Sequence, residues 1–193
     1  MKIAVLPGDG IGTEIVEQAL RVRSLAMALL RETCPDADAD AVRELAWACD
    51  LHEMGMMVSH HDHHRHSAYL LAHADAPGFS QSQQRRVADL VLGQRGGLRK
   101  VEASLAQETF AWQVLCLRLA IIKCHARAEV RSEALALQRN GNQAQLSFAS
   151  DWVVAHPRTL YLLQEEVQAW ARGGVLRLAL RERTDVQVVG YTR

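Results

Sequence analysis

The chain has 193 residues, of which 49% are hydrophobic and 23% are charged, and its formal net charge at pH 7 is zero. This composition is typical of a folded globular protein and excludes an intrinsically disordered chain. Because no net charge attracts a polyanion, any anion must be bound by local clusters, and we expect neither a nucleic-acid nor a membrane partner. Four isolated cysteines and the lack of a signal peptide favour reduced thiols in a cytoplasmic protein.

Helical patterns dominate the first two-thirds of the chain. Residues 2–7 are typical of a short buried strand, and a glycine-rich turn at 8–12 follows it. From residue 13 to about residue 127 apolar residues recur with a period near 3.6, and prolines and glycines mark the breaks. The predicted helices cover residues 13–33, 39–52, 61–73, 81–93 and 107–127. Ser80 is the expected cap of the fourth helix, and the fifth is the expected spine of the bundle.

The period of the pattern changes after residue 128. Asn140-Gly141-Asn142 separates the segments 134–139 and 143–148, and this turn signal predicts a β-hairpin. A helix over 158–172 and a strand over 175–181 follow, with a further strand expected at 186–191. The sequence therefore predicts a mainly α fold followed by a small α+β lobe.

The densest chemical signal lies in residues 51–71. Five of the nine histidines stand within seven residues, and the first of them follows the His52-Glu53 pair by seven residues. They are His60, His61, His63, His64 and His66. Imidazole beside a carboxylate binds divalent metal ions, and imidazole, guanidinium and a helix N-terminus all donate hydrogen bonds to phosphate oxygens. The segment therefore indicates a metal site, a phosphate site or both, and the alternative is a buried network without a ligand.

Three stretches carry a family resemblance. The pattern H-x-x-x-H-R-H-S-A-Y-L at 60–70, followed by D-A-P-G-F-S-Q-x-x-Q at 75–84, resembles the C-terminal region of the exopolyphosphatase/guanosine-pentaphosphate phosphatase family. Residues 151–157, together with Glu165, Glu166 and Trp170, resemble the small final lobe of the same family. The likeness covers roughly residues 18–180. It implies an HD-like helical bundle over 18–128 and a small α+β domain over 129–193.

The resemblance also implies a function. Members of this family carry a two-lobed actin-like region with the phosphate loops, the magnesium carboxylates and the catalytic glutamate, and these motifs do not occur here. The resemblance therefore implies a part that holds inorganic polyphosphate or guanosine pentaphosphate and forms a homodimer. Hydrolysis would belong to actin-like lobes, which a separate chain could supply. We accordingly assign no catalytic residue and expect no activity from the chain alone.

The candidate ligand-binding residues are basic side chains in and after the histidine-rich segment. For polyphosphate they are His60, His64, Arg65, His66, Arg85, Arg86 and Arg95. An alternative function is a stand-alone metal-dependent HD-type phosphohydrolase that uses Mg²⁺ or Mn²⁺. Its metal ligands would be His52, Glu53, His60 and His64, since residues four apart share one face of a helix. A third possibility is an assembly domain whose histidines are only structural.

The first 17 residues resemble a different family. MKIAVLPGDGIGTEIVE is similar to the opening of the isopropylmalate/isocitrate dehydrogenase family, but the further sites that this family needs do not follow. The glycine spacing G-x-G-x-G also differs from the dinucleotide fingerprint G-x-G-x-x-G. We therefore expect a foreign strand-turn segment over 1–17, joined to the rest near residues 17–20, and no dehydrogenase activity.

Overall fold

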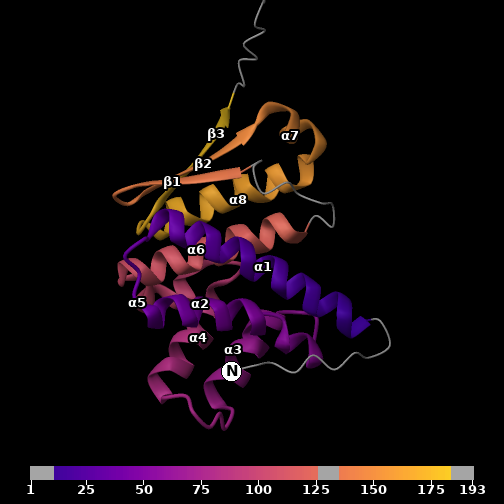
Figure 1. Ribbon diagram of the computed structural model, residues 1–193, viewed down its shortest axis with the longest axis vertical. Helices are drawn as coiled ribbons and strands as arrows, with labels where there is room; N and C mark the ends of the chain where they lie inside the picture. The colour runs from indigo at the N-terminus through magenta and orange to yellow at the C-terminus, as the bar shows by residue number, and fades with distance from the viewer. Residues whose placement is uncertain (1–10, 126–134, 184–193) are drawn as a thin grey trace, which may run out of the picture.

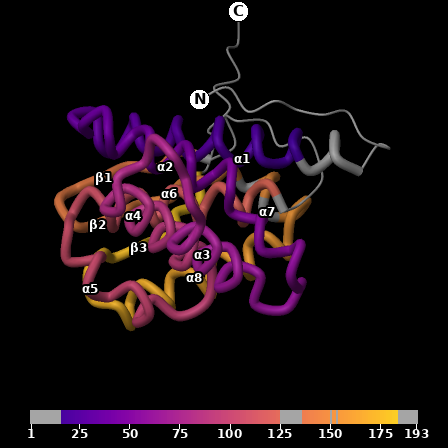
Figure 2. Tube along the Cα trace, turned by 90° about the horizontal axis from the view of Figure 1, so that it is seen from below, coloured from indigo at the N-terminus to yellow at the C-terminus, as the bar shows by residue number. Residues whose placement is uncertain are grey.

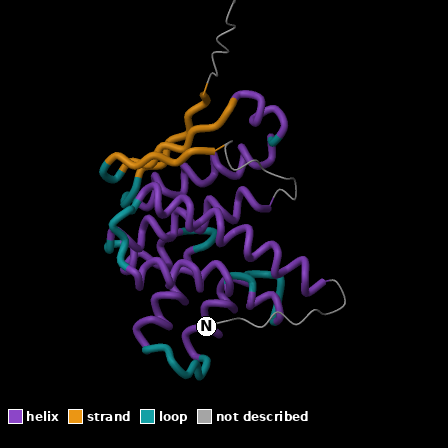
Figure 3. Tube along the Cα trace, viewed as in Figure 1, coloured by secondary structure: helices purple, strands orange, loops and turns teal. Residues whose placement is uncertain are grey.

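The computed structural model describes residues 11–125 and 135–183 (Figure 1). Most of the described chain is helical, and three strands form a small sheet at one end of the helical body (Figure 3). The predicted fold class, mainly α followed by a small α+β lobe, is confirmed.

The first part of the chain forms the helical body. Its elements are α1 Ile11–Thr33, α2 Ala39–Leu51, η1 Met54–Met57, α3 His63–His73, α4 Gln81–Gly93, η2 Leu98–Val101, α5 Glu102–Leu105 and α6 Glu108–His125. The side chain of Asp38 caps α2, and Ser80 and Gln83 form a capping box at the start of α4, which confirms the predicted cap. The short helices η1, η2 and α5 were not expected from the sequence, because segments of four residues carry no readable period.

Helix α6 is the spine of this body, as predicted. Every residue from 110 to 120 is buried. The helix contacts α1, α2, α4 and α5 of the helical body and α8 Pro157–Gly173 of the C-terminal lobe. A buried stretch of helix needs no polar face, and this explains the nearly continuous apolar sequence of these residues.

The sheet has the order β1-β2-β3. Strands β1 Leu135–Asn140 and β2 Gln143–Ala149 pair antiparallel, with Asn140 opposite Gln143 and with Gly141 at a φ of 58°, so the predicted hairpin is confirmed. Helices α7 Ser150–Ala155 and α8 follow, and β3 Arg177–Arg183 then pairs in parallel with β2. The connection from β2 through α8 to β3 is a βαβ crossover, which allows the parallel pairing.

One continuous set of buried side chains joins the sheet to the helices. It contains residues of the helical body together with Leu137, Leu146 and Leu178 of the strands. Contacts of β1 with α1 and of β3 with α8 seat the sheet on the helices, an arrangement that Figure 2 shows from below. Arg139 of β1 strengthens this junction, because its guanidinium donates 3.2 Å to the Thr33 carbonyl and lies over the Trp112 ring.

Several expectations fall outside the described residues. The predicted strands at 2–7 and 186–191 lie there, as do most of the glycine-rich turn and the expected boundary at residues 128–129. None of the described helices combines the length and the apolar character that crossing a membrane requires.

Candidate functional site

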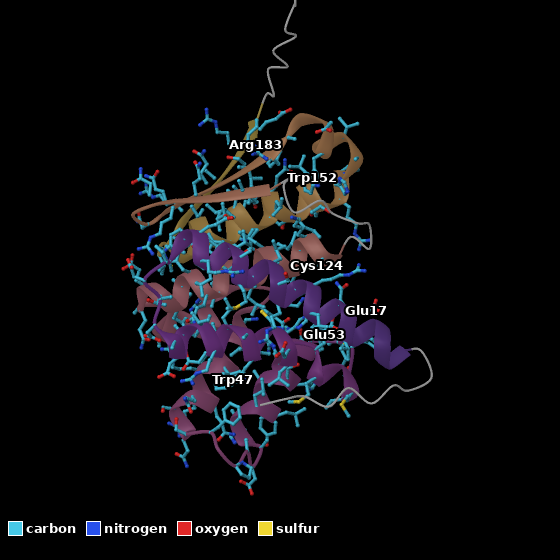
Figure 4. All side chains as sticks on the ribbon, in the orientation of Figure 1. Glu17, Trp47, Glu53, Cys124, Trp152 and Arg183 are labelled. Atoms are coloured by element: carbon cyan, nitrogen blue, oxygen red, sulfur yellow. The ribbon has the colours of Figure 1, made fainter. Side chains whose placement is uncertain are left out.

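A cleft of about 780 Å³ opens between α8 and the helical body. Four segments line it: the end of α2 with η1 and α3, the loop after α4, the face of α6 and one side of α8. The polar lining residues are His52, Glu53, His60, His63, Gln94, Arg95, Arg99, Arg118, Arg158, Glu165, Glu166 and Arg172. Figure 4 labels Glu53, which lies on the histidine-bearing side of the cleft. Because five of these residues are arginines, we call this space the arginine cleft.

Four of the five arginines have no carboxylate partner among the described residues. Arg95 stands on the loop after α4 and Arg99 on η2, and Arg158 and Arg172 stand near the two ends of α8. At a rise of about 1.5 Å per residue, Arg158 and Arg172 are about 21 Å apart along the helix. The segment after α4 and the cleft side of α8 therefore both present positive charge, which on α8 spans most of the length of the helix.

Arg118 differs from the other four because its charge is neutralised. Its guanidinium makes a two-pronged ion pair with the carboxylate of Glu166, with Nη2 lying 2.7 Å from Oε2. Its Nη1 donates 2.7 Å to the carbonyl of Gly93, and Trp170 Nε1 donates 2.7 Å to Glu166 Oε1. Both members of the pair are only 4% exposed. A buried charge requires such pairing, so Arg118 is not available to a ligand in this arrangement.

Residues 52–67, which we call the histidine turn, form the wall opposite α8. The ring nitrogen Nδ1 of His52 lies 2.7 Å from the Cys49 carbonyl. A carbonyl only accepts, so Nδ1 carries the proton and Nε2 presents a lone pair, 3.9 Å from Glu53 Oε1. Burial lowers the pKa of His52 below its ordinary value, which favours this neutral form.

Ser67 holds the histidine turn together. Its hydroxyl donates 3.0 Å to the His52 carbonyl and accepts 2.7 Å from the Gly55 N–H. Gly55 itself approaches α3 closely, since a Cβ added there would lie 2.1 Å from the carbonyl oxygen of His63. Ser67 thus has a structural role, tying η1 to α3.

His63 and His64 are buried and neutral at pH 7. Burial, and next the charge of Arg95, lower the pKa of His63, whose Nε2 lies 3.4 Å from Arg95 Nη1. Burial, and next the charge of Lys100, lower the pKa of His64 to about 4. The Nδ1 atoms of both rings are buried without a hydrogen-bond partner in the structure. The arginine cleft is therefore flanked by imidazoles that carry no positive charge of their own.

The structure brings two of the predicted polyphosphate-binding residues to the cleft, namely His60 and Arg95. The others lie elsewhere: His64 is buried, Arg65 and Arg85 are exposed, and His66 is half-buried. Arg86 forms an ion pair with Glu44, with a distance of 2.7 Å between Nε and Oε2, beside a second, smaller cavity of about 260 Å³.

Sequence reasoning missed most of the cleft. The predicted polyphosphate-binding residues do not include Arg158 and Arg172, because α8 is distant in sequence and only the fold brings it to the cleft. They also do not include His63 and Arg99, although both lie in or near the histidine-rich segment. One signal was available for Arg118 and Glu166. A lone arginine inside the apolar run of α6 must find a buried partner, and this requirement points to an acid on a neighbouring helix.

The predicted metal ligands are placed differently from the expectation. His52, Glu53 and His60 line the arginine cleft, but α3 begins at His63, so His60 and His64 do not share a helix face and that part of the reasoning is wrong. Across residues 11–125 and 135–183, no three histidine, cysteine, aspartate or glutamate side chains gather in a way that could hold a metal ion. Metal binding by this set stays a prediction.

Comparisons with known proteins agree with the resemblance seen in the histidine-rich segment. The family described as Ppx/GppA phosphatase, domain III, matches residues 15–167. The chain is also similar to the guanosine-5'-triphosphate,3'-diphosphate pyrophosphatase of Pseudoalteromonas translucida (strain TAC 125), with 30% identity over 168 residues that cover 82% of this chain and 33% of the relative. The chain thus spans about a third of the length of this curated relative. From the matched residues and this relative together, the chain belongs to the Ppx/GppA phosphatase family.

Proposed function

We propose that this chain is the part of a Ppx/GppA-type phosphatase that holds a linear phosphate polyanion in the arginine cleft. The observation that carries the proposal is the set of four cleft arginines without a carboxylate partner among the described residues. Unpaired arginines on two walls, two of them spread over about 21 Å of α8, suit a ligand that carries several phosphate groups. Inorganic polyphosphate and guanosine pentaphosphate both meet this description.

The histidine turn would complete the binding surface. His60 lines the cleft and is exposed, and Arg95 of the adjoining loop lies close to His63, with Nη1 3.4 Å from Nε2. The other candidates from the sequence, such as Arg65 and Arg85, would act outside the cleft as a weaker path for a long chain. Exposed charges that only approach a polyanion are strongly screened by salt.

Hydrolysis is proposed to require more than this chain. The curated relative is about three times as long, and no side chain here is assigned as a nucleophile or general base. The purified chain, for which we also propose a homodimeric state, should release no phosphate from polyphosphate in the presence of Mg²⁺. Added actin-like lobes, on the same or a separate chain, should be needed for turnover. Phosphate release by rigorously purified protein would contradict this part of the proposal.

Polyphosphate binding by calorimetry at two salt concentrations tests the proposal. We expect binding that weakens as salt rises, because each neutralised phosphate releases counterions. Arg95→Gln should weaken binding, whereas Arg85→Gln removes the same charge from the exposed surface of α4 and should change it much less. Equal losses in the two variants would place the polyanion outside the arginine cleft, and no binding by the unaltered chain would refute the proposal.

A metal-dependent phosphohydrolase remains the second candidate. One observation favours it: Nδ1 of His52 is held by a backbone carbonyl, which leaves Nε2 free beside Glu53, and metal-binding histidines are oriented in this way. In this function His52, Glu53 and His60, with His64 after a rearrangement, would hold Mg²⁺ or Mn²⁺. Elemental analysis after Mn²⁺ loading tests it, with His52→Gln as the comparison. A stoichiometric ion that His52→Gln loses supports the enzyme, and the absence of bound metal refutes it.

A further inference from the structure

The two walls of the arginine cleft are connected through one buried side chain. Arg118 rises from α6 at the floor between them. One side of its guanidinium binds Gly93, the last residue of α4, and the other binds Glu166 on α8. Since α6 is buried over residues 110–120, Arg118 has a fixed base from which to hold both walls.

The wall formed by the loop after α4 depends on this anchor. The Gly93 carbonyl belongs to the last turn of α4, where carbonyls lack helical partners, and Arg118 supplies the missing donor. The next residue, Gln94, donates 2.9 Å to the His52 carbonyl, and Lys100 Nζ donates 2.6 Å to the carbonyl of Arg95. The loop that carries Arg95 and Arg99 is thus tied down at its start and along its length.

The wall formed by α8 is held by the same Arg118 guanidinium, through its ion pair with Glu166. Glu166 lies midway between Arg158 and Arg172, and Trp170 donates to the same carboxylate that Arg118 binds. Both oxygens of Glu166 are occupied by these donors. This carboxylate therefore ties α8 to α6 between the two arginines of α8, in addition to the apolar packing of Leu163 and Trp170.

We infer that Arg118 and Glu166 are positioning residues, which fix α8 against the loop of residues 94–99 so that arginines from both walls meet one polyanion. This inference deepens the proposed function and rests on it. The pair adds no net charge to the arginine cleft, since each member neutralises the other. Its contribution is the distance and the orientation between the two arginine-bearing walls.

A purely electrostatic role makes the opposite prediction. If Glu166 only cancelled the charge of Arg118, Glu166→Gln would release one more cation into the arginine cleft. Polyphosphate would then bind more tightly, and its salt dependence would steepen by about one unit of slope. A positioning role predicts weaker binding, because the walls lose their alignment while the number of available arginines does not fall.

The test compares Glu166→Gln with Glu165→Gln in the full chain. Glu165 is the neighbouring cleft residue, exposed and without an ion pair among the described residues, so it gives the same change of charge without touching Arg118. We expect Glu166→Gln to weaken polyphosphate binding at least fivefold relative to Glu165→Gln. Amide hydrogen exchange should also become faster in residues 94–99. Binding as tight as that of Glu165→Gln, with unchanged exchange, would overturn the inference.

Arg118→Lys provides the second variant and protects the test against misfolding. It keeps the positive charge but loses the two-pronged geometry. It should weaken binding and accelerate exchange in the same way, and wild-type behaviour in both measurements would overturn the inference. If the unaltered chain does not bind polyphosphate at low salt, the proposed function fails by itself. The exchange of residues 94–99 still decides then whether the pair positions this loop.

Discussion

The histidine turn forms one wall of the arginine cleft, but its histidines and the arginines of the cleft differ in burial and in charge. In the histidine turn, His52, His63 and His64 are buried, and burial favours their neutral forms. In the arginine cleft, arginines from distant parts of the sequence remain charged, and four of the five have no described counter-ion. Within the cluster that is dense in the sequence, His63 and His64 are buried whereas His60 and His61 are exposed, and residues scattered along the sequence supply the unpaired charge of the cleft.

Arg118 is the cleft arginine that is paired with a carboxylate, and its replacement should give the largest loss of stability. Arg118→Met leaves the Glu166 carboxylate buried without a cation, and we expect the free energy of unfolding to fall by about 3–5 kcal/mol. The double variant Arg118→Met/Glu166→Met removes both charges and should recover most of this loss. Urea denaturation measures both. A double variant as unstable as the single one would show that the pair matters through its shape rather than its charge.

Gly55 tests the close packing of the histidine turn. A Cβ in Gly55→Ala would lie 2.1 Å from the His63 carbonyl oxygen and 2.4 Å from the Ser67 nitrogen, and both are backbone atoms. Because η1 must then move away from α3, we expect a loss of about 1–3 kcal/mol in the free energy of unfolding. Gly97→Ala is the matched control, since Gly97 has a φ of −66° and nothing lies within 4 Å of its added Cβ. Similar losses in the two variants would contradict the close contact.

The neutral histidines should make the protein sensitive to acid. The folded-state pKa of His64 is about 4, below the value of 6.5 in the unfolded chain. Between these two pH values the unfolded chain binds more protons, so stability is complete above pH 6.5 and is lost as the pH falls toward 4. The expected loss from His64 is on the order of 2 kcal/mol.

Denaturation at pH 7.5 and pH 4.5 measures this loss. His64→Gln should flatten the difference between the two pH values. His61→Gln should leave it unchanged, because the His61 side chain is 94% exposed. An unchanged pH dependence in His64→Gln would mean that His64 is not held neutral by the fold.

The smallest effect is expected for a free cleft arginine. Arg158→Gln should change the free energy of unfolding by less than about 0.5 kcal/mol, since the side chain is exposed and unpaired among the described residues. It should weaken polyphosphate binding by up to about 1 kcal/mol and lower the salt slope by about one. Arg181→Gln, on the exposed side of β3, should leave binding unaltered. A clear loss of stability in Arg158→Gln would show that this arginine, like the buried histidines, supports the fold.

Much of the fold could be predicted from the sequence, because its signals are local. The period of the apolar residues, the cap at Ser80 and the turn at Gly141 each depend on a few neighbouring residues, and each is confirmed. The parallel pairing of β3 with β2 was not predicted, since it depends on how α8 crosses the sheet. Nor could the start of α3 be placed at His63, because Asp62 adopts a left-handed φ of 53° that only the contacts of the turn impose.

The candidate site was harder to predict, because its residues come from distant parts of the sequence and meet only in the folded chain. Arg95 and His60 were chosen because they stand near the histidine-rich segment. Arg158 and Arg172 carry no local mark that separates them from ordinary surface arginines, and only the position of α8 across from the loop gives them a role. His64 was predicted to bind polyphosphate because it lies among several histidines in the sequence, but the fold buries it.

The burial of residues 110–120 in α6 has a consequence for how the chain is made. Helices α1, α2, α4 and α5, which precede α6, cover part of its surface, while α8 covers another part and leaves the ribosome later. During synthesis, part of the apolar surface of α6 therefore stays uncovered until α8 has been made. Until α8 folds against it, this apolar surface is exposed to water, and such exposure favours aggregation.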